Sequence, residues 1–203
     1  MTRVAVLVSG SGTNLQALLD AERAGTLAPG VIACVVSNRP GVGALDRAAA
    51  AGKPAIVVDH KQFTGREPFE DALHAALAAH GVEIVVLAGF MRLLTARFLD
   101  RYPDRVINVH PSLLPAFPGV DAQRQAFDHG VKVAGCTVHF VNAALDDGAI
   151  ILQAAVPVAD DDDAETLRAR ILVEEHRLLP RAVQLLCAGR LARDGRRVGV
   201  HRT

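Results

Sequence analysis

The sequence carries no net charge, because 22 lysines and arginines balance 22 aspartates and glutamates. Proteins that bind nucleic acids or membrane surfaces usually carry an excess of basic residues, so this composition gives no electrostatic support for either partner. Long apolar runs are also lacking: no stretch approaches the roughly 18 continuous apolar residues that cross a bilayer. We therefore expect small-molecule partners, with no nucleic acid and no membrane among them.

Cysteine is scarce. Its three copies, Cys34, Cys136 and Cys187, are scattered and form no C-x-x-C pair. Such a set predicts free buried thiols in a reducing compartment rather than a disulfide framework. The apolar run at the N-terminus is too short for a signal peptide and leads into a Gly/Ser loop instead of a cleavage site. These features favour a cytoplasmic protein.

The motifs of metal and covalent catalysis are missing as well. Eight histidines are spread along the chain without H-E-x-x-H or paired Cys/His spacing, so we expect no metal site. No serine occupies a G-x-S-x-G elbow. His139 shares a strand face with Thr137 and is interpreted as a satisfied core histidine.

The sequence does contain an alternation of short β-branched runs and helical segments. Expected strands are Arg3–Val8, Val31–Ser37, Ala55–Val58, Glu83–Ala88 and Arg105–Val109, and expected helices are Asn14–Ala24, Gly43–Ala51 and Phe69–His80. Continuous apolar strands bounded by helices indicate a parallel sheet covered on both faces. Further on, Lys132–Val141 and Ile150–Val158 predict an antiparallel hairpin, and Ala164–Ala188 predicts a long helix.

The expected fold class is therefore α/β. It is a single domain with a doubly wound, mostly parallel sheet, an antiparallel hairpin near the C-terminal half and a long C-terminal helix. We expect this domain to span residues 1–188. The basic C-terminal tail, residues 189–203, is expected to fray.

Asn108-Val109-His110-Pro111 stands at the end of an expected strand. Because strand side chains alternate faces, Asn108 and His110 should project to the same side, with Pro111 blocking further pairing. An amide and an imidazole in one small volume suit chemistry at a carbonyl carbon. The alternative is a polar strand end with a solvated histidine. A carboxylate beside His110 would favour the charged imidazole, and both Asp146 and Asp147 fit that role by sequence.

The first strand leads into Ser9-Gly10-Ser11-Gly12-Thr13-Asn14-Leu15. Free N–H groups and the helix dipole at such a junction make an anion site. The loop lacks the Gly-Lys-Thr of nucleoside triphosphate loops, and Leu15 replaces the third glycine of G-x-G-x-x-G. A single phosphate monoester fits it better than a pyrophosphate. The alternative is a tight turn in which Thr13 or Asn14 caps the helix.

Glu175 falls in the apolar stripe of the last expected helix, between Ile171 and Leu179. A carboxylate there is costly to bury without a partner. It is either half of an ion pair, with Arg168 as one mate, or an acceptor for the hydroxyls or amine of a substrate. Upstream, Asp162-x-x-Glu165 is interpreted as a helix cap rather than as part of a metal cluster.

Six segments together resemble the phosphoribosylglycinamide formyltransferases, the folate-dependent enzymes of purine synthesis. They are Ser-Gly-Ser-Gly-Thr-Asn-Leu-Gln at 9–16, Leu-Ala-Gly-Phe-Met-Arg-Leu-Leu at 87–94, Asn-Val-His-Pro-Ser-Leu-Leu-Pro at 108–115, Thr-Val-His-Phe-Val at 137–141, Leu-Asp-x-Gly at 145–148 and Glu-His-x-x-x-Pro at 175–180. The resemblance covers the chain from Ser9 to about Pro180. Three positions, Ala116, Asp121 and Leu172, depart from the family's pattern.

The resemblance implies a Rossmann-like enzyme that transfers the formyl group of 10-formyltetrahydrofolate, its co-substrate, to the amine of 5'-phosphoribosylglycinamide. Direct attack by the amine would pass through a tetrahedral intermediate, without a metal. The implied catalytic residues are Asn108, His110 and Asp146, and this choice decides against Asp147. The implied glycinamide ribonucleotide-binding residues are Gly12, Thr13, Asn14 and Glu175. The implied folate-binding residues are Arg66, Met91, Arg92, Leu93, Leu94, Asn108, Asn142, Ala143, Ala144, Leu145 and Asp146.

Three rival functions follow from the same residues. A formyltetrahydrofolate hydrolase would use the same trio with water as acceptor, but such relatives carry an additional N-terminal domain, and the sequence begins directly at its first strand. Transfer to initiator methionyl-tRNA would need an RNA-binding domain and a basic surface. A non-catalytic binding module would keep the phosphate loop without needing the trio. The expected assembly is a monomer or a homodimer.

Overall fold

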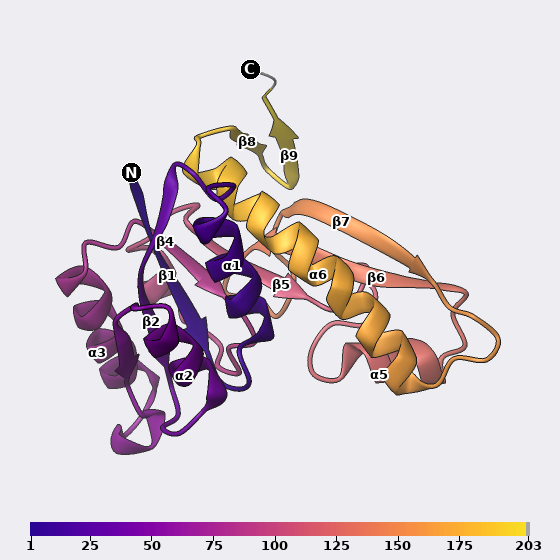
Figure 1. Cartoon of the computed structure of the whole chain (residues 1–203), viewed down its shortest axis with the longest axis horizontal. Helices are drawn as coiled ribbons and strands as arrows, with labels where there is room; N and C mark the ends of the chain where they lie inside the picture. The colour runs from indigo at the N-terminus through magenta and orange to yellow at the C-terminus, as the bar shows by residue number, and fades with distance from the viewer. Residues whose placement is uncertain (202–203) are drawn as a thin grey trace.

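The computed structural model describes residues 1–201, which form a twisted sheet flanked by helices (Figure 1). The elements in chain order are β1 (Thr2–Val8), α1 (Thr13–Arg23), β2 (Gly30–Ser37), α2 (Gly43–Ala50), β3 (Ala55–Val57), a short 3-10 turn (His60–Gln62), α3 (Arg66–Ala79), β4 (Ile84–Leu87), α4 (Ala96–Leu99), β5 (Val106–His110), α5 (Ala122–Asp128), β6 (Val133–Phe140), β7 (Ile150–Pro157), α6 (Ala164–Cys187), β8 (Leu191–Asp194) and β9 (Arg197–Val200). None of the described helices combines the length and the hydropathy that a membrane-spanning helix needs.

The main sheet has seven strands in the order β3-β2-β1-β4-β5-β6-β7. The first five pair in parallel, whereas β6 and β7 run antiparallel to their neighbours. Alternate residues of β1 enter different cores: Val4 and Val6 pack with α1 and α6, and Ala5 and Leu7 pack with α3 and α4. A strand buried on both faces explains why its sequence is apolar throughout.

The structure confirms the expected α/β class, the appended β6–β7 hairpin and the long last helix. It also confirms that all three cysteines are free and buried. The helices α4 and α5 were not expected. They are short, with four and seven residues, and so carry little helical periodicity for sequence analysis to detect.

Two local expectations were wrong. Residues 191–200, within the tail expected to fray, form the antiparallel hairpin β8–β9. The cap of α6 is Asp163, which accepts from the Thr166 N–H in a capping box, rather than the Asp162–Glu165 pair. Asp162 instead binds the Arg170 guanidinium. Both errors concern short polar segments, where several partners fit the same residue types.

The strand order reverses between β1 and β4. On one side of β1 the sheet continues with β2 and β3, and on the other side it continues with β4 and β5. In doubly wound sheets the crevice at the carboxyl ends of such strands is the usual ligand site. The segments that leave β1, β4 and β2 are tied together there. The Ser9 hydroxyl donates to Asn38 Oδ1 (2.5 Å) and accepts from the Met91 N–H (2.9 Å).

Gly12 is required at the exit of β1. Its φ is 75°, in the left-handed region that favours glycine. A Cβ built on it would lie 2.6 Å from the Cβ of Ala44 on α2. Helices α1 and α2 therefore approach each other closely at this glycine.

We predict that Gly12→Ala lowers the free energy of unfolding by about 1–3 kcal/mol, from backbone strain and the clash with α2. Urea unfolding measures this directly. Gly10→Ala is the matched control, because a Cβ at Gly10 would meet nothing within 4 Å. Equal stability of the two variants would contradict the close approach.

Candidate active site

His110 is the last residue of β5, and only 4% of its surface is exposed. Its Nδ1 lies 3.4 Å from Asp146 Oδ2, and its Nε2 lies 2.9 Å from the carbonyl oxygen of Phe117. A carbonyl oxygen only accepts hydrogen bonds, so Nε2 carries a proton. Both ring nitrogens thus face oxygen acceptors, an arrangement that suits a charged imidazolium.

Asp146 reaches this position from the loop between β6 and β7. Its side chain is 10% exposed, and Oδ2 accepts a hydrogen bond of 2.8 Å from the Gly119 N–H. Its φ of 48° is unusual for a residue other than glycine, although aspartate tolerates it. Asp147 points elsewhere and pairs with Arg196. Of the two carboxylates left open by the residue pattern, the structure brings only Asp146 to His110.

Asn108 on β5 lies directly opposite His139 on β6 in the strand register, and the two side chains are in contact. The His139 Nδ1 lies 2.8 Å from the Phe140 carbonyl oxygen, which makes Nδ1 the donor. Burial lowers the pKa of His139, despite the opposing effects of that hydrogen bond and the Asp146 charge. The neutral ring therefore accepts, through Nε2, from the Asn108 amide at 3.2 Å. The second amide hydrogen of Asn108 stays available to a ligand.

His139 is buried and hydrogen-bonded, as interpreted from the sequence, but sequence reasoning missed its link to Asn108. The Nε2 of His139 is also 3.8 Å from Asp146 Oδ1. Because the lowered pKa keeps the ring neutral, this approach is not an ion pair. The contact between His139 and Asn108 follows from the register of β5 against β6. The sequences of the two strands do not specify that register.

The loop after β5 supplies the Phe117 carbonyl and the Gly119 N–H. Thr137 anchors this loop from β6 and is fully buried. Its hydroxyl donates to the Ser112 carbonyl at 2.7 Å and accepts from the Leu114 N–H at 3.0 Å. The backbone groups around His110 and Asp146 are thus fixed by the sheet itself.

The exit of β1 forms an open helix N-terminus. Gly12 is the N-cap of α1 and places no side chain on the first-turn N–H groups. The alternative in which Thr13 or Asn14 caps the helix is wrong, since no side-chain cap is formed. The Arg47 guanidinium adds positive charge nearby and donates to the Ser11 carbonyl at 2.9 Å. Free N–H groups, the helix dipole and an arginine together suit an anion.

Asn14 instead donates to Glu175 Oε2 at 2.7 Å. Both side chains are buried, and Asn14 Oδ1 has no hydrogen-bond partner among residues 1–201. Burial raises the pKa of Glu175, and the Asn14 hydrogen bond and the Arg168 charge oppose that rise. Arg168 is not its mate, because that guanidinium pairs with Glu165. The pair thus offers an unused acceptor at the edge of the anion site.

The segment after β4 and the β6–β7 loop present apolar side chains to solvent. Met91 is 61% exposed, Leu93 49% and Leu145 51%. The side chain of Leu94, in contrast, is buried in the core with α3 and α4. Arg92 is half-buried, and Asn142, Ala143 and Ala144 lie at the surface of the loop. Arg66 begins α3 and is exposed, with no side-chain contact that ties it to His110 in the described chain.

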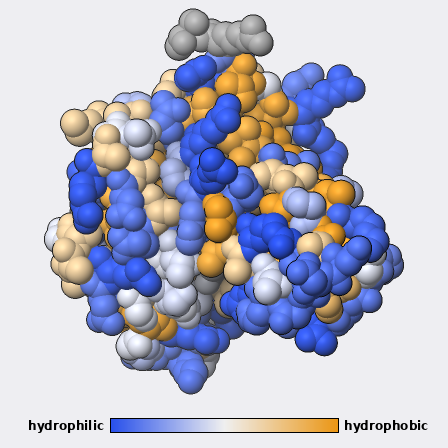
Figure 2. All heavy atoms as spheres, turned by 45° about the vertical axis from the view of Figure 1, so that its right-hand side comes forward, coloured by the Kyte–Doolittle hydropathy of each residue, from blue (hydrophilic) through white to orange (hydrophobic). Residues whose placement is uncertain are grey.

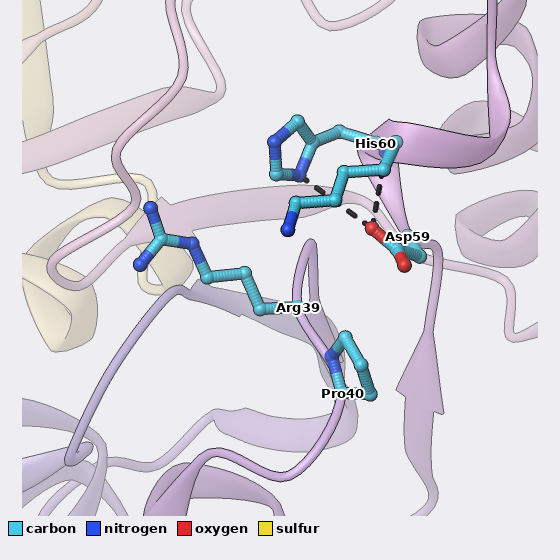
Figure 3. A pocket seen from close by; sticks show the side chains of 5 residues that line it. Arg39, Pro40, Asp59 and His60 are labelled. Atoms are coloured by element: carbon cyan, nitrogen blue, oxygen red, sulfur yellow. Dashed lines mark hydrogen bonds and ion pairs between the residues drawn. The ribbon is translucent and has the colours of Figure 1, made fainter.

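A separate hollow of about 430 Å³ is lined by Arg39, Pro40, Asp59, His60 and Lys61. Figure 3 shows this hollow from close by. Its walls follow β2 and β3, and His60 Nδ1 lies 2.8 Å from the Asn38 carbonyl oxygen. It contains none of the residues that surround His110. Within residues 1–201 no cluster of three or more His, Cys, Asp or Glu side chains is arranged to hold a metal ion.

Comparison with known proteins identifies the family. Residues 2–183 match the formyl transferase family. The chain belongs to this family. Its sequence is 40% identical over 191 residues to the phosphoribosylglycinamide formyltransferase of Haemophilus influenzae, covering 94% of this chain and 90% of that protein. Its fold matches glycinamide ribonucleotide transformylase 1 of Symbiobacterium toebii with a TM-score of 0.96 and 55% identity, over 98% of this chain and 94% of that one.

The chain is therefore a formyltransferase, and the full-length matches place it among the phosphoribosylglycinamide formyltransferases. It is also 50% identical over 190 residues to the trifunctional purine biosynthetic protein adenosine-3 of Drosophila melanogaster. That match covers 92% of this chain but only 14% of the relative, so this chain spans about a seventh of the length of that protein.

We predict that His139→Leu lowers kcat about tenfold through loss of the Asn108 orientation, with little change in KM. Steady-state kinetics with the formyl donor and acceptor provide the measurement. His74→Leu is the control, because His74 makes its hydrogen bond to Tyr102 on the α3 side of the sheet. A His139→Leu enzyme with normal kcat would show that Asn108 does not depend on this contact.

We predict that Glu175→Gln stabilises the ligand-free enzyme near neutral pH. A raised folded-state pKa means that the ionised carboxylate costs folding free energy above that pKa, and this cost is absent below the unfolded value of 4.5. Glutamine keeps an oxygen for Asn14 but cannot ionise. Chemical denaturation should show a gain near neutral pH that disappears below the unfolded value. Glu174→Gln, on the more exposed face beside Arg177, should show no such gain.

Proposed function

We propose that this formyltransferase transfers the formyl group of 10-formyltetrahydrofolate to the amine of 5'-phosphoribosylglycinamide. The products are formylglycinamide ribonucleotide and tetrahydrofolate, in de novo purine biosynthesis. The main support for this proposal is that two different sites lie along the same edge of the sheet. One is an anion site with a buried polar pair, Asn14–Glu175, and the other is a carbonyl-chemistry site built on Asn108, His110 and Asp146.

The spacing of the two sites supports this acceptor. The anion site follows β1 and His110 ends β5, with only β4 between them. Neighbouring strands lie about 4.8 Å apart, so the two strand ends are separated by about 10 Å. A ribose phosphate spans such a gap. With its phosphate on the α1 N-terminus, Asn14 and Glu175 would bind the ribose hydroxyls or the amine.

The surface beside the trio fits the formyl donor. Met91, Leu93 and Leu145 offer apolar contact to a flat bicyclic ring, and backbone groups of the 142–146 loop offer hydrogen bonds to its polar edge. The donor supplies an activated formyl carbon on N10. Arg66 and Arg92 would meet the negatively charged end of the donor. Leu94, buried beneath this surface, supports it by packing.

The trio then acts on the oxygen of the formyl group. The amine nitrogen attacks the formyl carbon directly, and the bond from that carbon to N10 breaks, so no covalent link to the enzyme forms. The free amide hydrogen of Asn108 would donate to the developing oxyanion, a contribution of about 3–4 kcal/mol for a well-placed donor. The two ring nitrogens of His110 already face Asp146 and the Phe117 carbonyl oxygen, so its imidazolium would act on the oxyanion through its charge. Asp146 would orient the His110 ring through its contact with Nδ1. It also passes a proton from the amine toward N10 through water.

The hydrolase alternative uses the same trio, and the Asn14–Glu175 pair is what argues against it. A hydrolase has no need of a buried acceptor oxygen beside an anion site. We further propose that the enzyme works in the cytoplasm, as a monomer or a homodimer. Its partners in this proposal are its two small-molecule substrates, without nucleic acid or membrane.

We predict acceptor-dependent release of tetrahydrofolate when the enzyme is incubated with 10-formyltetrahydrofolate. His110→Ala or Asn108→Ala should lower kcat by about 100-fold or more, with smaller changes in KM, because their contacts form in the transition state. His60→Ala, in the separate hollow, is the control. Release of tetrahydrofolate without glycinamide ribonucleotide would indicate the hydrolase instead.

A further inference from the structure

The C-terminal hairpin β8–β9 contacts β7, the strand that follows the β6–β7 loop. This loop, residues 141–149, carries Asp146 and is called the catalytic loop below. Figure 1 shows this hairpin beside β7, next to the end of α6. The matched family region ends at residue 183, so the hairpin lies outside it. No role has been given to residues 190–201 in the function proposed above.

The hairpin is anchored on the body of the protein by its apolar side. Leu191 and Val198, one from each strand, pack against the core shared by α1 and α6. The base is closed by Arg190, whose carbonyl accepts from the His201 N–H and whose guanidinium donates to the His201 carbonyl. Figure 2 shows apolar residues gathered in the upper part of that face of the molecule. The hairpin is therefore a fixed platform rather than a loose tail.

Two arginines of the β8–β9 hairpin contact residues at the two ends of the catalytic loop. Arg196, in the turn between β8 and β9, binds both carboxylate oxygens of Asp147 at 3.1 and 3.2 Å. Arg193 lies over the ring of Phe140, with 5.8 Å from its guanidinium carbon to the ring centroid, and also pairs with Asp104. Phe140 is the last residue of β6, and Asp147 directly follows Asp146.

Between Phe140 and Asp147, the backbone of the catalytic loop is tightly constrained around Asp146. At Gly148, a Cβ would clash with the Phe140 carbonyl oxygen, so the loop closes tightly onto the end of β6. Asp146 itself adopts a left-handed backbone conformation, which costs free energy unless the surroundings hold it. On the next residue, Asp147, the bidentate contact from Arg196 restrains the carboxylate in position and orientation, although both side chains are largely exposed.

We propose that the C-terminal hairpin is a clamp for the catalytic loop, in which Arg196 acts through Asp147 as a positioning residue for Asp146. The inference rests on the formyl transfer proposed above, because it assigns Asp146 its catalytic contact with His110. Arg196 touches neither His110 nor Asp146. Its effect on catalysis is indirect and depends on the carboxylate of Asp147.

The test compares Arg196→Ala with Arg197→Ala in the full-length chain. Arg197 is the adjacent arginine, and its side chain forms no hydrogen bond or ion pair within residues 1–201. Arg196→Ala should lower kcat about three- to tenfold and leave KM for glycinamide ribonucleotide unchanged, because the loop shifts while the acceptor site does not. Both variants should melt within about 2 °C of the wild type, because exposed ion pairs add little to global stability.

Two further measurements separate positioning from other effects. Amide hydrogen exchange in residues 142–148 should accelerate in Arg196→Ala and not in Arg197→Ala, and this readout needs no activity. Arg196→Asp alone should lower kcat further through like-charge repulsion. Combining it with Asp147→Arg should restore kcat, because the pair is rebuilt with its charges exchanged.

The outcomes are distinct from those of the functional proposal. A wild-type enzyme without formyl transfer overturns the function, whereas an active wild type with unchanged kcat and exchange in Arg196→Ala overturns the clamp. Equal losses in Arg196→Ala and Arg197→Ala also overturn it, since the effect is then one of lost surface charge. Failure of the exchanged pair to recover kcat overturns it as well.

Discussion

A histidine and a carboxylate buried together at the end of a strand oblige the protein to satisfy every polar atom around them. The side chains of His110 and Asp146 are only 6% and 10% exposed, so protein groups must supply most of their hydrogen-bond partners. The Phe117 carbonyl and the Gly119 N–H meet this need from one loop. Beside them, His139 of β6 pairs with the amide of Asn108 on β5. Removing one partner would leave a buried polar group unpaired, which costs more than the lost hydrogen bond itself.

The sheet provides the rigidity that this network needs. β1, β4 and β5 end at one edge, next to the point where the strand order reverses. An open helix N-terminus follows β1 and the imidazole ends β5, so the proposed acceptor site and the proposed formyl chemistry would lie along the same edge of the sheet. β6 runs antiparallel to β5, with Phe140 opposite Ile107, so the β6–β7 loop leaves the sheet beside the start of β5 and folds back to bring Asp146 to His110. One sheet topology thus accounts for both halves of the proposed reaction.

The sequence predicted the parallel strands, the β6–β7 hairpin and the long helix because each has a clear apolar pattern. It also placed Asn108 and His110 at a strand end. It could not predict the contact of His139 with Asn108, since that contact depends on the register between two strands. The Asn14–Glu175 pair was missed for a similar reason: the residues are 161 positions apart, and a local pattern offered Arg168 instead.

The C-terminal hairpin shows the same limit more sharply. Residues 190–203 have few apolar residues and several arginines, a composition typical of frayed tails. The two apolar residues that anchor it, Leu191 and Val198, are too few to give a periodic signal. Their burial follows from the exposed core edge beside α6, which only the folded protein presents.

The most direct measurement of the central claim is a single-turnover experiment with a donor that is isotopically labelled in its formyl carbon. The account predicts that the label appears as an amide of glycinamide ribonucleotide, at the same rate as tetrahydrofolate forms. It also predicts that no label appears as formate. Label recovered as formate at that rate, in the presence of saturating glycinamide ribonucleotide, would contradict the account.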